Sequence, residues 1–496
     1  MQETCNRGLS LQQEYGVFML TSIYVDHAAT TPVDPRVLEA MRPFFMSHFG
    51  NPSSAHSVGA AARQAIEKAR SRIAELISAA PEEVYFTSGG TEADNLAMKG
   101  YSLANSAKGR HIIVSSIEHH AVLHSAETLH KLDFEVSIVP VDGFGYVDPQ
   151  DVKRALRKDT ILISVMHANN EVGTLQDVAE IGRIAKEAGI IFHTDAVQTA
   201  GSIPVDVNEL GVDMLSLSAH KFYGPKGIGA LYVRNGIRII PLLDGGAQEH
   251  GFRAGTENVP AIVGMGVAAQ LAQMEMASRS MHISQLRDLL IDDILHLDPN
   301  IALNGHRQKR LPGNVSICLG KTPYQESLEA LNSKGICAST GSACTSHAAK
   351  PSHVLTAMGI PPEKAMSVLR FTFGKANTET DVEGIVEELH NIMKSASKPF
   401  RYVSTTRDSA QIRQSSEDKA TITVDVRGFY CPVPVLKTKE VFDSMTIGDT
   451  LQVIADDPAA ESDLQNWITF TGQRAIGVQR RDSEICFLIK KIGDIL

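Results

Sequence analysis

The stretch "SAAPEEVYFTSGGTEADNLAMKGY", residues 78–101, joins a short β-branched apolar run to a glycine turn and then to an amphipathic run. The alternation continues downstream, where "QDVAEIGRIAKEAG" (176–189) is typical of a helix that ends at Gly189. Six runs have the pattern of strands: residues 83–88, 111–117, 135–141, 160–168, 189–197 and 213–221. This order predicts an α/β fold with a largely parallel sheet, helices on both faces, and a ligand site at the carboxyl ends of the strands.

The chain has 496 residues, which exceeds what one hydrophobic core usually serves. The pattern changes near residue 257, where a long helical stretch begins, and again at a polar, charged stretch with almost no apolar periodicity. We therefore expect five parts: an N-terminal extension (1–22), a large domain (23–257), a small α+β domain (258–397), a linker (398–420) and a small two-layer α+β domain (421–496).

Composition excludes several classes of function. The formal net charge is -10, and the basic residues are scattered, which argues against a DNA-binding surface. The six cysteines are dispersed and form no C-x-x-C pair, so neither a disulfide framework nor a metal site is expected. Because no apolar run is long enough to span a bilayer and the cysteine usage fits a reducing compartment, we expect a cytoplasmic chain without a membrane partner.

Three polar motifs follow strand-like runs. In "TSGGTEADN" (87–95) glycines precede a helix, and free backbone amides there suit a phosphate, although a capped turn without a ligand fits about as well. Lys221, in "SAHKFYGPKGIG", is a candidate for an amine held near an anionic cofactor. Lys226 is the competing candidate, and an ordinary solvated surface charge is the alternative to a cofactor role. Asp195, in "FHTDAVQTAG", could bind the protonated nitrogen of a pyridine ring, or it could only cap the N-terminus of a helix. Together the three motifs favour a pyridoxal phosphate site.

Eight segments resemble the cysteine desulfurases of the NifS/IscS group, which are fold-type I pyridoxal-phosphate-dependent transferases. In chain order they are "VDHAATTPVDPRV", "NPSSAHSVG", "TSGGTEADN", "MHANNEVGT", "HTDAVQTAG", "SAHKFYGPKGIGALYV", "RAGTENV" and "STGSACTSHAAKPSHVL". The resemblance covers about residues 23 to 395. It implies a homodimer that binds pyridoxal 5'-phosphate and converts L-cysteine to L-alanine.

The resemblance also implies roles for single residues. Lys221 falls on the Schiff-base lysine, Asp195 on the partner of the pyridine nitrogen, and Gln198 on the partner of the phenolic oxygen. His119 falls on the histidine that stacks on the ring and handles protons. The residues expected to bind the phosphate are Gly90, Thr91, Ser218 and His220, with Thr256 from a partner subunit. Asn170 is expected to lie beside the cofactor and to bind the substrate carboxylate together with Arg370.

The sulfur-accepting thiol of the family falls on Cys344 in "GSACTS". Its small, polar neighbours suit an exposed loop and a reactive thiol, whereas Cys318 and Cys337 lie in apolar contexts and are interpreted as structural. In the implied reaction Lys221 removes the Cα proton of the substrate, and the Cys344 thiolate then takes its sulfur as a persulfide.

The tail carries the pattern D-x-x-G-x-x-C-P-x-P-V-x-x-x-K and a later "DDP", which resemble the TusA/SirA-like sulfur carriers. Proline is tolerated in a first helical turn, so Cys431 should lie just before or at a helix start, where the helix dipole lowers the pKa of a thiol. A flexible linker of 23 residues spans about 25 Å. We therefore expect Cys344 to pass sulfur to Cys431 for downstream acceptor proteins, in tRNA thiolation, cofactor synthesis or iron–sulfur cluster assembly.

Two alternatives stay open at this point. The enzyme could be a selenocysteine lyase or another pyridoxal-phosphate enzyme that cleaves at Cβ. The tail could be a docking or regulatory module that binds RNA or a scaffold protein, although a cysteine within C-P-x-P favours the relay. Residues 1–22, which precede the resemblance, are expected to be a dispensable extension or the result of an upstream start.

Overall fold

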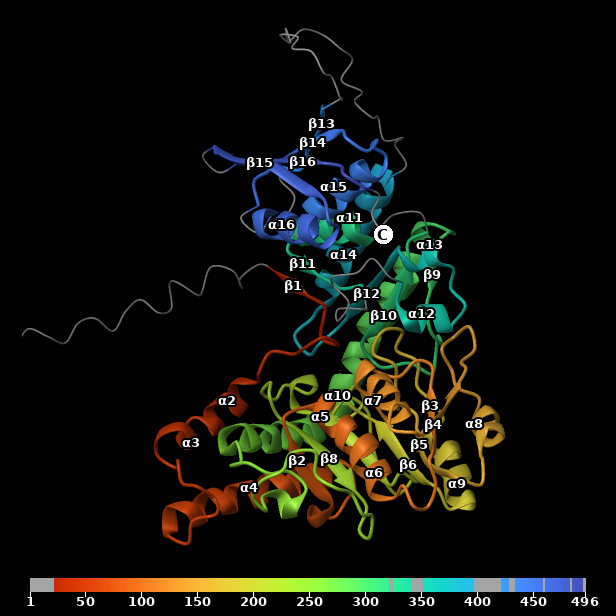
Figure 1. Cartoon of the computed structure of the whole chain (residues 1–496). Helices are drawn as coiled ribbons and strands as arrows, with labels where there is room; N and C mark the ends of the chain where they lie inside the picture. The colour runs from red at the N-terminus through yellow and green to blue at the C-terminus, as the bar shows by residue number, and fades with distance from the viewer. Residues whose placement is uncertain are drawn as a thin grey trace, which may run out of the picture. The chain divides into compact units, whose positions relative to one another are not determined.

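The computed structural model describes residues 22–320, 324–340, 351–396, 421–427, 433–457, 460–481 and 484–493. The chain forms two compact units, residues 1–400 and residues 401–496, both drawn in Figure 1. Cys344, Cys431 and the predicted linker lie outside the described residues. In the described part of the chain, no helix has the length and apolar character needed to cross a membrane.

A seven-stranded sheet with the order β2-β8-β7-β6-β5-β3-β4 forms the centre of the first unit. Its strands are β2 (Val84–Thr87), β3 (His111–Ser115), β4 (Glu135–Val139), β5 (Thr160–Ser164), β6 (Ile191–Asp195), β7 (Met214–Ser218) and β8 (Gly229–Val233). Strand β8 runs antiparallel to both neighbours, and the other pairs are parallel. The predicted strands and the largely parallel sheet are confirmed.

Helices cover both faces of this sheet, which is why every residue of β3, β5 and β7 is buried. Along β3, Ile113 packs into one core and Ile112 into the other. The first core contains residues of α4 (Ser57–Leu76), α8 (Pro149–Ala155), α9 (Val178–Ala188) and α10 (Val259–Leu297). The second contains residues of α5 (Gly90–Asn95), η2 (Leu96–Gly100), α6 (Tyr101–Ala104) and α7 (His120–His130). Helix α9 ends where predicted, at Gly189, whose φ of 68° is left-handed.

A further core in the first unit gathers segments that lie far apart in the sequence. Strand β1 (Ile23–Tyr24) pairs in parallel with β11 (Ile336–Cys337), and a second small sheet has the order β12-β10-β9. Its strands are β9 (Ala302–Leu303), β10 (Asn314–Cys318) and β12 (Val368–Thr372), with α11 (Tyr324–Ser333) and α14 (Glu379–Ala396) packed against them. The remaining short elements are α2 (Pro35–Met41), α3 (Pro43–Met46), η1 (Pro81–Glu83), η3 (Ala219–Lys221), η4 (Glu249–Gly251), α12 (His353–Ala357) and α13 (Pro362–Ala365).

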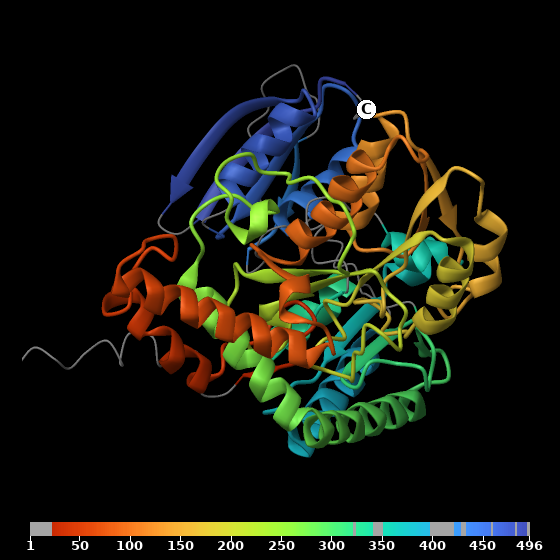
Figure 2. The same cartoon turned by 90° about the horizontal axis from the view of Figure 1, so that it is seen from below.

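Helix α10 belongs to two cores. Its first half, from Val259 to Ala272, packs with the large sheet, and its second half, from Ile283 to Ile294, packs with the small sheets. In Figure 2 the green α10 runs from beside the orange-red α4 toward the cyan residues of the small sheets. The sequence places a domain boundary between residues 257 and 258, whereas the buried residues change core near the middle of this helix.

The second unit is a four-stranded sheet with helices packed against it. Its elements are β13 (Thr421–Asp425), α15 (Val433–Asp443), β14 (Thr450–Ala455), α16 (Ala460–Phe470), β15 (Arg474–Arg481) and β16 (Glu484–Lys490), with the strand order β13-β14-β16-β15. Phe442, Leu464 and Phe487 are fully buried in its core. The sequence analysis did not recognise β15, because the strand is rich in arginine and a register shift between Ala475 and Gly477 interrupts its alternation.

The packing of α10 on α4 predicts that Gly266→Ala lowers the melting temperature of the chain. A Cβ at position 266 would lie 2.6 Å from the Cα of Ala69, so the helices must separate, at a cost of about 1–3 kcal/mol. Gly384→Ala is the matched control, because a Cβ there would meet the Cδ1 of Ile23 at 3.2 Å, and alanine gains about 1 kcal/mol of helix propensity. Calorimetry should place the first variant below wild type and the control at or above it. Equal melting temperatures for the two variants would contradict this packing.

Candidate active site

The carboxyl ends of β6 and β7 meet the start of α5. A Cβ at Gly90 would lie 2.7 Å from Cγ2 of Val197 and 3.6 Å from Cβ of Ser218, so only a glycine fits between the two strand ends. Ser218 is buried, and Thr91 is exposed in the first turn of α5. The structure therefore brings Gly90 and Ser218, two of the predicted phosphate residues, into one place beside free backbone amides.

Asp195, the last residue of β6, is 5% exposed. Its Oδ1 accepts a hydrogen bond from the backbone N–H of Val197 at 2.9 Å, and no ion pair joins it to a lysine, arginine or histidine in the described part of the chain. Burial raises the pKa of Asp195, while His119 and Lys221 act to lower it. A cationic group next to this carboxylate would remove the cost of burying its charge.

His119 lies close enough to Asp195 for each to influence the pKa of the other. It is the N-cap of α7, and its Nδ1 accepts from the backbone N–H of Ala121 at 3.2 Å. Burial lowers the pKa of His119, so the imidazole is neutral at physiological pH. The structure thus places a neutral base beside the aspartate.

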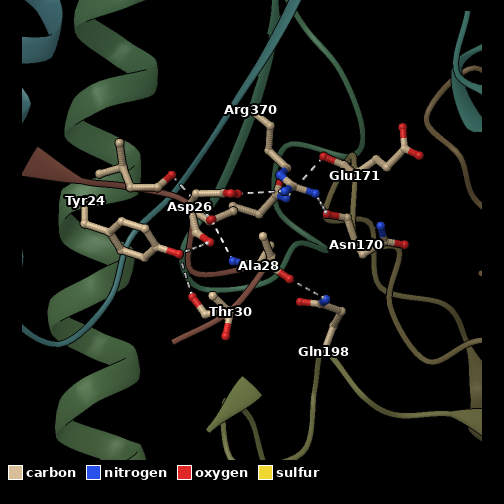
Figure 3. A network of polar contacts seen from close by, with 12 residues as sticks. Tyr24, Asp26, Ala28, Thr30, Asn170, Glu171, Gln198 and Arg370 are labelled. Carbon is tan, nitrogen blue, oxygen red and sulfur yellow. Dashed lines mark hydrogen bonds and ion pairs between the residues drawn. The ribbon is translucent and has the colours of Figure 1, made fainter. Parts of the chain in front are cut away.

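Lys221 and Gln198 meet at one carbonyl of the N-terminal segment. The Nζ of Lys221 donates to the carbonyl oxygens of Ala28 and Ala29, the latter at 2.9 Å, and Nε2 of Gln198 donates to Ala28 at 3.1 Å. Figure 3 shows the contact between Gln198 and Ala28. Lys221 is half-buried, whereas its competitor Lys226 is exposed. This difference favours Lys221 as the lysine that faces a ligand.

His220 contacts the same N-terminal segment. Its Nδ1 lies 3.1 Å from the Oγ1 of Thr30, and its carbonyl oxygen accepts from the hydroxyl of Thr31 at 3.0 Å. Burial, followed by the charges of Lys221 and Lys226, lowers the pKa of His220 to about 4. A neutral imidazole can hold a phosphate oxygen only as a hydrogen-bond donor.

Arg370 and Asn170 are brought together at the edge of the small sheet. Arg370, in β12, is buried and forms an ion pair with Asp26 at 2.8 Å between Nη2 and Oδ1. Its Nη1 donates to the carbonyl oxygen of Asn170 at 3.0 Å, as Figure 3 shows. Thr256 lies exposed in the loop before α10, and among the hydrogen bonds of the described residues none joins it to this group. Its role across a subunit boundary stays a prediction.

Four neighbours of the candidate site were given no role in the sequence analysis. Asp26 and Ala28 lie in "VDHAATTPV", a segment that was quoted for its resemblance without a role for either residue. Glu118 is fully buried, and its Oε1 accepts from Ser115 and from the backbone N–H of Met166 at 2.9 Å. Asp94 is also buried, and burial followed by the charge of Asp195 raises its pKa. The available signal was the acidic side chains of Asp26 and Asp94 inside quoted motifs, whereas Glu118 lies outside all eight quoted segments.

Comparison with known proteins places this site in a family. Residues 23–385 match the family model Aminotransferase class-V, and residues 422–491 match Sulfurtransferase TusA. The chain belongs to the aminotransferase class-V family. It therefore has the fold of the type I pyridoxal-phosphate transferases, followed by a TusA domain, and both expectations from the sequence are confirmed.

Several relatives carry the name cysteine desulfurase IscS. One from Dictyoglomus turgidum is 50% identical over 398 residues, which cover 80% of this chain and 100% of the relative. Another, from Methanosarcina thermophila, is 52% identical over 75% of this chain and 92% of the relative. A solved NifS-like protein has a TM-score of 0.71 and 38% identity, and covers 75% of this chain and 100% of its own.

Pyridoxal 5'-phosphate is the cofactor of this family, as expected from the sequence. The residues in place fit it on independent grounds. Asp195 is a buried carboxylate in need of a cationic partner, Gly90 lets the start of α5 pack closely against the ends of β6 and β7, and the half-buried amine of Lys221 lies nearby.

The protonation of Glu118 predicts a pH-dependent effect of the change Glu118→Gln. Burial raises the pKa of this carboxyl to about 8, above its ordinary value of about 4.3. A raised pKa gives stability that is complete below the ordinary value and is lost as the pH rises through about 8. The glutamine variant lacks this loss, so its melting temperature relative to wild type should increase from about pH 5 to about pH 8. Glu127→Gln, an exposed change on α7, is the control; identical trends in both variants would contradict the buried acid.

Proposed function

We propose that this chain, a pyridoxal-phosphate-dependent cysteine desulfurase, collects the sulfur of L-cysteine on Cys344 and passes it to Cys431 of its own TusA domain. The observation that carries the proposal is the meeting of Lys221, His119 and the buried Asp195 at strand ends, in a chain that also contains a TusA domain. The relatives named cysteine desulfurase IscS support the first step.

The cofactor would be held by residues that the fold places at the strand ends. In the proposal Gly90, Thr91, Ser218 and His220 hold the phosphate, and Asp195 and Gln198 hold the ring nitrogen and the phenolic oxygen. Thr256 would come from the partner subunit of a homodimer. When bound, the cofactor supplies an electron sink next to the amino group of the substrate.

Arg370 would bind the carboxylate of L-cysteine, with Asn170 beside it. The ion pair with Asp26 and the bond to the carbonyl of Asn170 already fix the guanidinium, so little side-chain entropy is lost on binding. Lys221 would then accept the Cα proton, and the neutral His119 would handle the proton that is moved next.

Sulfur transfer then takes place between thiols. The Cys344 thiolate attacks the sulfur of the substrate, the bond between Cβ and that sulfur breaks, and the electron pair remains with carbon until protonation gives L-alanine. The Cys431 thiolate next attacks the outer sulfur of the Cys344 persulfide, and Cys344 leaves as a thiolate. A downstream acceptor protein, in tRNA thiolation, cofactor synthesis or iron–sulfur cluster assembly, would receive the sulfur. A cytoplasmic location stays a prediction.

The relay predicts where sulfur is found after a turnover. The cofactor-loaded chain is incubated with L-cysteine, its thiols are alkylated, and added sulfur is located by peptide mass spectrometry. Wild type should carry sulfur on both cysteines, Cys431→Ala on Cys344 alone, and Cys344→Ala on neither, because Cys431 depends on the first thiol. Cys337→Ala and Cys486→Ala are matched controls and should resemble wild type.

Two results would contradict the relay. One is sulfur on Cys431 in the Cys344→Ala variant at the wild-type level. The other is a wild-type chain in which Cys344 becomes loaded while Cys431 never does. In the second case the desulfurase step stands and the transfer step fails, so the two parts of the proposal are tested separately.

The assignment of Lys221 predicts the site of covalent cofactor attachment. Borohydride reduction of the loaded chain, followed by peptide mapping, should find the phosphopyridoxyl group on Lys221, because this amine is half-buried while Lys226 is exposed. Lys226→Ala should leave the labelled peptide unchanged, and Lys221→Ala should remove the label. A label on Lys226 in wild type would overturn the assignment.

A further inference from the structure

The hydroxyl of Thr31 contacts the main chain before and after Lys221. It donates to the carbonyl oxygen of His220 at 3.0 Å and accepts from the N–H of Tyr223 at 2.9 Å. The N–H of Thr31 donates to the same carbonyl oxygen of His220, also at 3.0 Å. Thr31 is 3% exposed, so water does not compete for these hydrogen bonds. A single buried side chain therefore fixes the turn in which Lys221 lies.

These contacts do not involve the amine of Lys221. In this structure its Nζ donates to the carbonyl oxygens of Ala28 and Ala29, and those two bonds must change when Nζ carries the cofactor. The bonds of Thr31 are made to the main chain. They can therefore hold the lysine both when its amine is attached to the cofactor and when the amine is free to accept a proton.

The main chain that Thr31 holds is strained at Tyr223. Its φ is 67°, in the left-handed region that residues other than glycine rarely adopt. Strain of this kind persists only where the surrounding contacts determine the conformation. Here the N–H of Tyr223 is bonded to Thr31, and its carbonyl oxygen accepts from the N–H of Asp34 at 3.0 Å. Both main-chain polar groups of Tyr223, two positions after Lys221, are thus held by the N-terminal segment.

The side chain of Tyr223 is fixed as well. The residue is 7% exposed, and its hydroxyl accepts from the backbone N–H of Lys375 at 2.8 Å. The centroid of its ring lies 4.6 Å from the Nζ of Lys375 and 5.3 Å from the Cζ of Arg279. Lys375 follows β12, the strand that contains Arg370. Tyr223 therefore connects the Lys221 turn to the chain that follows the proposed substrate-binding arginine.

The segment that presents Thr31 has little conformational freedom. Thr31 precedes Pro32, and a residue before proline is restricted to extended conformations. The segment continues to Asp34, the N-cap of α2, whose Oδ1 accepts from the backbone N–H of Arg36 at 2.9 Å. Pro35 occupies the first position of that helix. A rigid segment of this kind is a suitable support for a turn that must hold a reactive lysine.

We propose that Thr31 and Tyr223 are positioning residues, which fix the main chain of Lys221 so that its amine reaches the Cα proton of the substrate. This inference rests on the proposed function of Lys221 as the lysine that carries the cofactor and accepts that proton. Misplacing a reacting group by about 1 Å can lower a rate about 100-fold. Valine at position 31 has nearly the shape of threonine but cannot form the two hydroxyl bonds. The change Thr31→Val should therefore slow proton removal.

The test compares alanine formation from L-cysteine and from L-cysteine deuterated at Cα, by the full-length chain and per loaded cofactor. Thr31→Val should lower kcat about 10- to 100-fold and increase the kinetic isotope effect on kcat, since removal of the Cα proton becomes the slow step. KM should stay within about two-fold of wild type, because Arg370 keeps its contacts with Asp26 and Asn170. Thr31→Ser keeps the hydroxyl and should restore kcat and the isotope effect toward wild type.

Thr160→Val is the matched control. Thr160 is 7% exposed, and its hydroxyl oxygen accepts from the backbone N–H of Arg157 at 2.8 Å. It begins β5, whereas Lys221 follows the end of β7, and β5, β6 and β7 run parallel, so the two residues lie at opposite ends of the strands. This variant also loses a buried hydroxyl, but it should keep the wild-type kcat and isotope effect.

Two results would overturn the positioning role. One is an isotope effect in Thr31→Val equal to that of Thr160→Val, and the other is a Thr31→Ser variant as slow as Thr31→Val. If Thr31→Val does not fold, Tyr223→Phe, which lacks only the hydroxyl bonded to Lys375, decides the matter. An increased isotope effect in Tyr223→Phe supports the role, and the wild-type value contradicts it.

Borohydride mapping of wild type separates this inference from the proposed function. Attachment of the cofactor to a lysine other than Lys221 would contradict the proposed function, and the positioning role with it. Attachment to Lys221, combined with an unchanged isotope effect in Thr31→Val, would contradict the positioning role alone.

Discussion

The proposed active site depends on one buried acidic group, Asp195 at the end of β6. Burial makes the charged form of an acid unfavourable, and no ion pair in the described part of the chain compensates Asp195. The same burial keeps its titratable neighbours neutral: it raises the pKa of Glu118 to about 8 and lowers that of His193 to about 3. In the proposed site the negative charge of Asp195 would hold the ring nitrogen of the cofactor protonated, and a protonated ring is the better electron sink.

The N-terminal segment connects Asp195 to Arg370, which we propose binds the substrate. Ala28 accepts hydrogen bonds from Lys221 and Gln198, and Asp26, two residues earlier, holds Arg370 across 344 positions of sequence. Strand β1 anchors the same segment to β11 in the core of the small sheets. Since α10 also belongs to both cores, the lysine and the arginine are positioned by elements that run between the two.

The sequence predicted those strands and helix ends that are determined by local residue patterns. Strands buried on both faces, such as β5 and β7, stand out as continuous apolar runs, and Gly189 marks the end of α9. Strand β15 was missed because its arginines and its register shift hide the period of two. Contacts between distant segments leave no local trace, which is why the contacts of Asp26 and Glu118 emerged only from the structure, although Asp26 lies within a motif that carried the resemblance.

The most direct test of the central claim is nitrogen-15 NMR of the loaded chain with isotope-labelled cofactor, in wild type and in Asp195→Asn. Asparagine keeps the shape and a hydrogen-bonding group but removes the charge. The account predicts that the ring nitrogen is protonated in wild type across the range of pH in which the chain is folded, and that it loses its proton in the variant. An unprotonated ring nitrogen in wild type, or equal protonation in the two proteins, would contradict it.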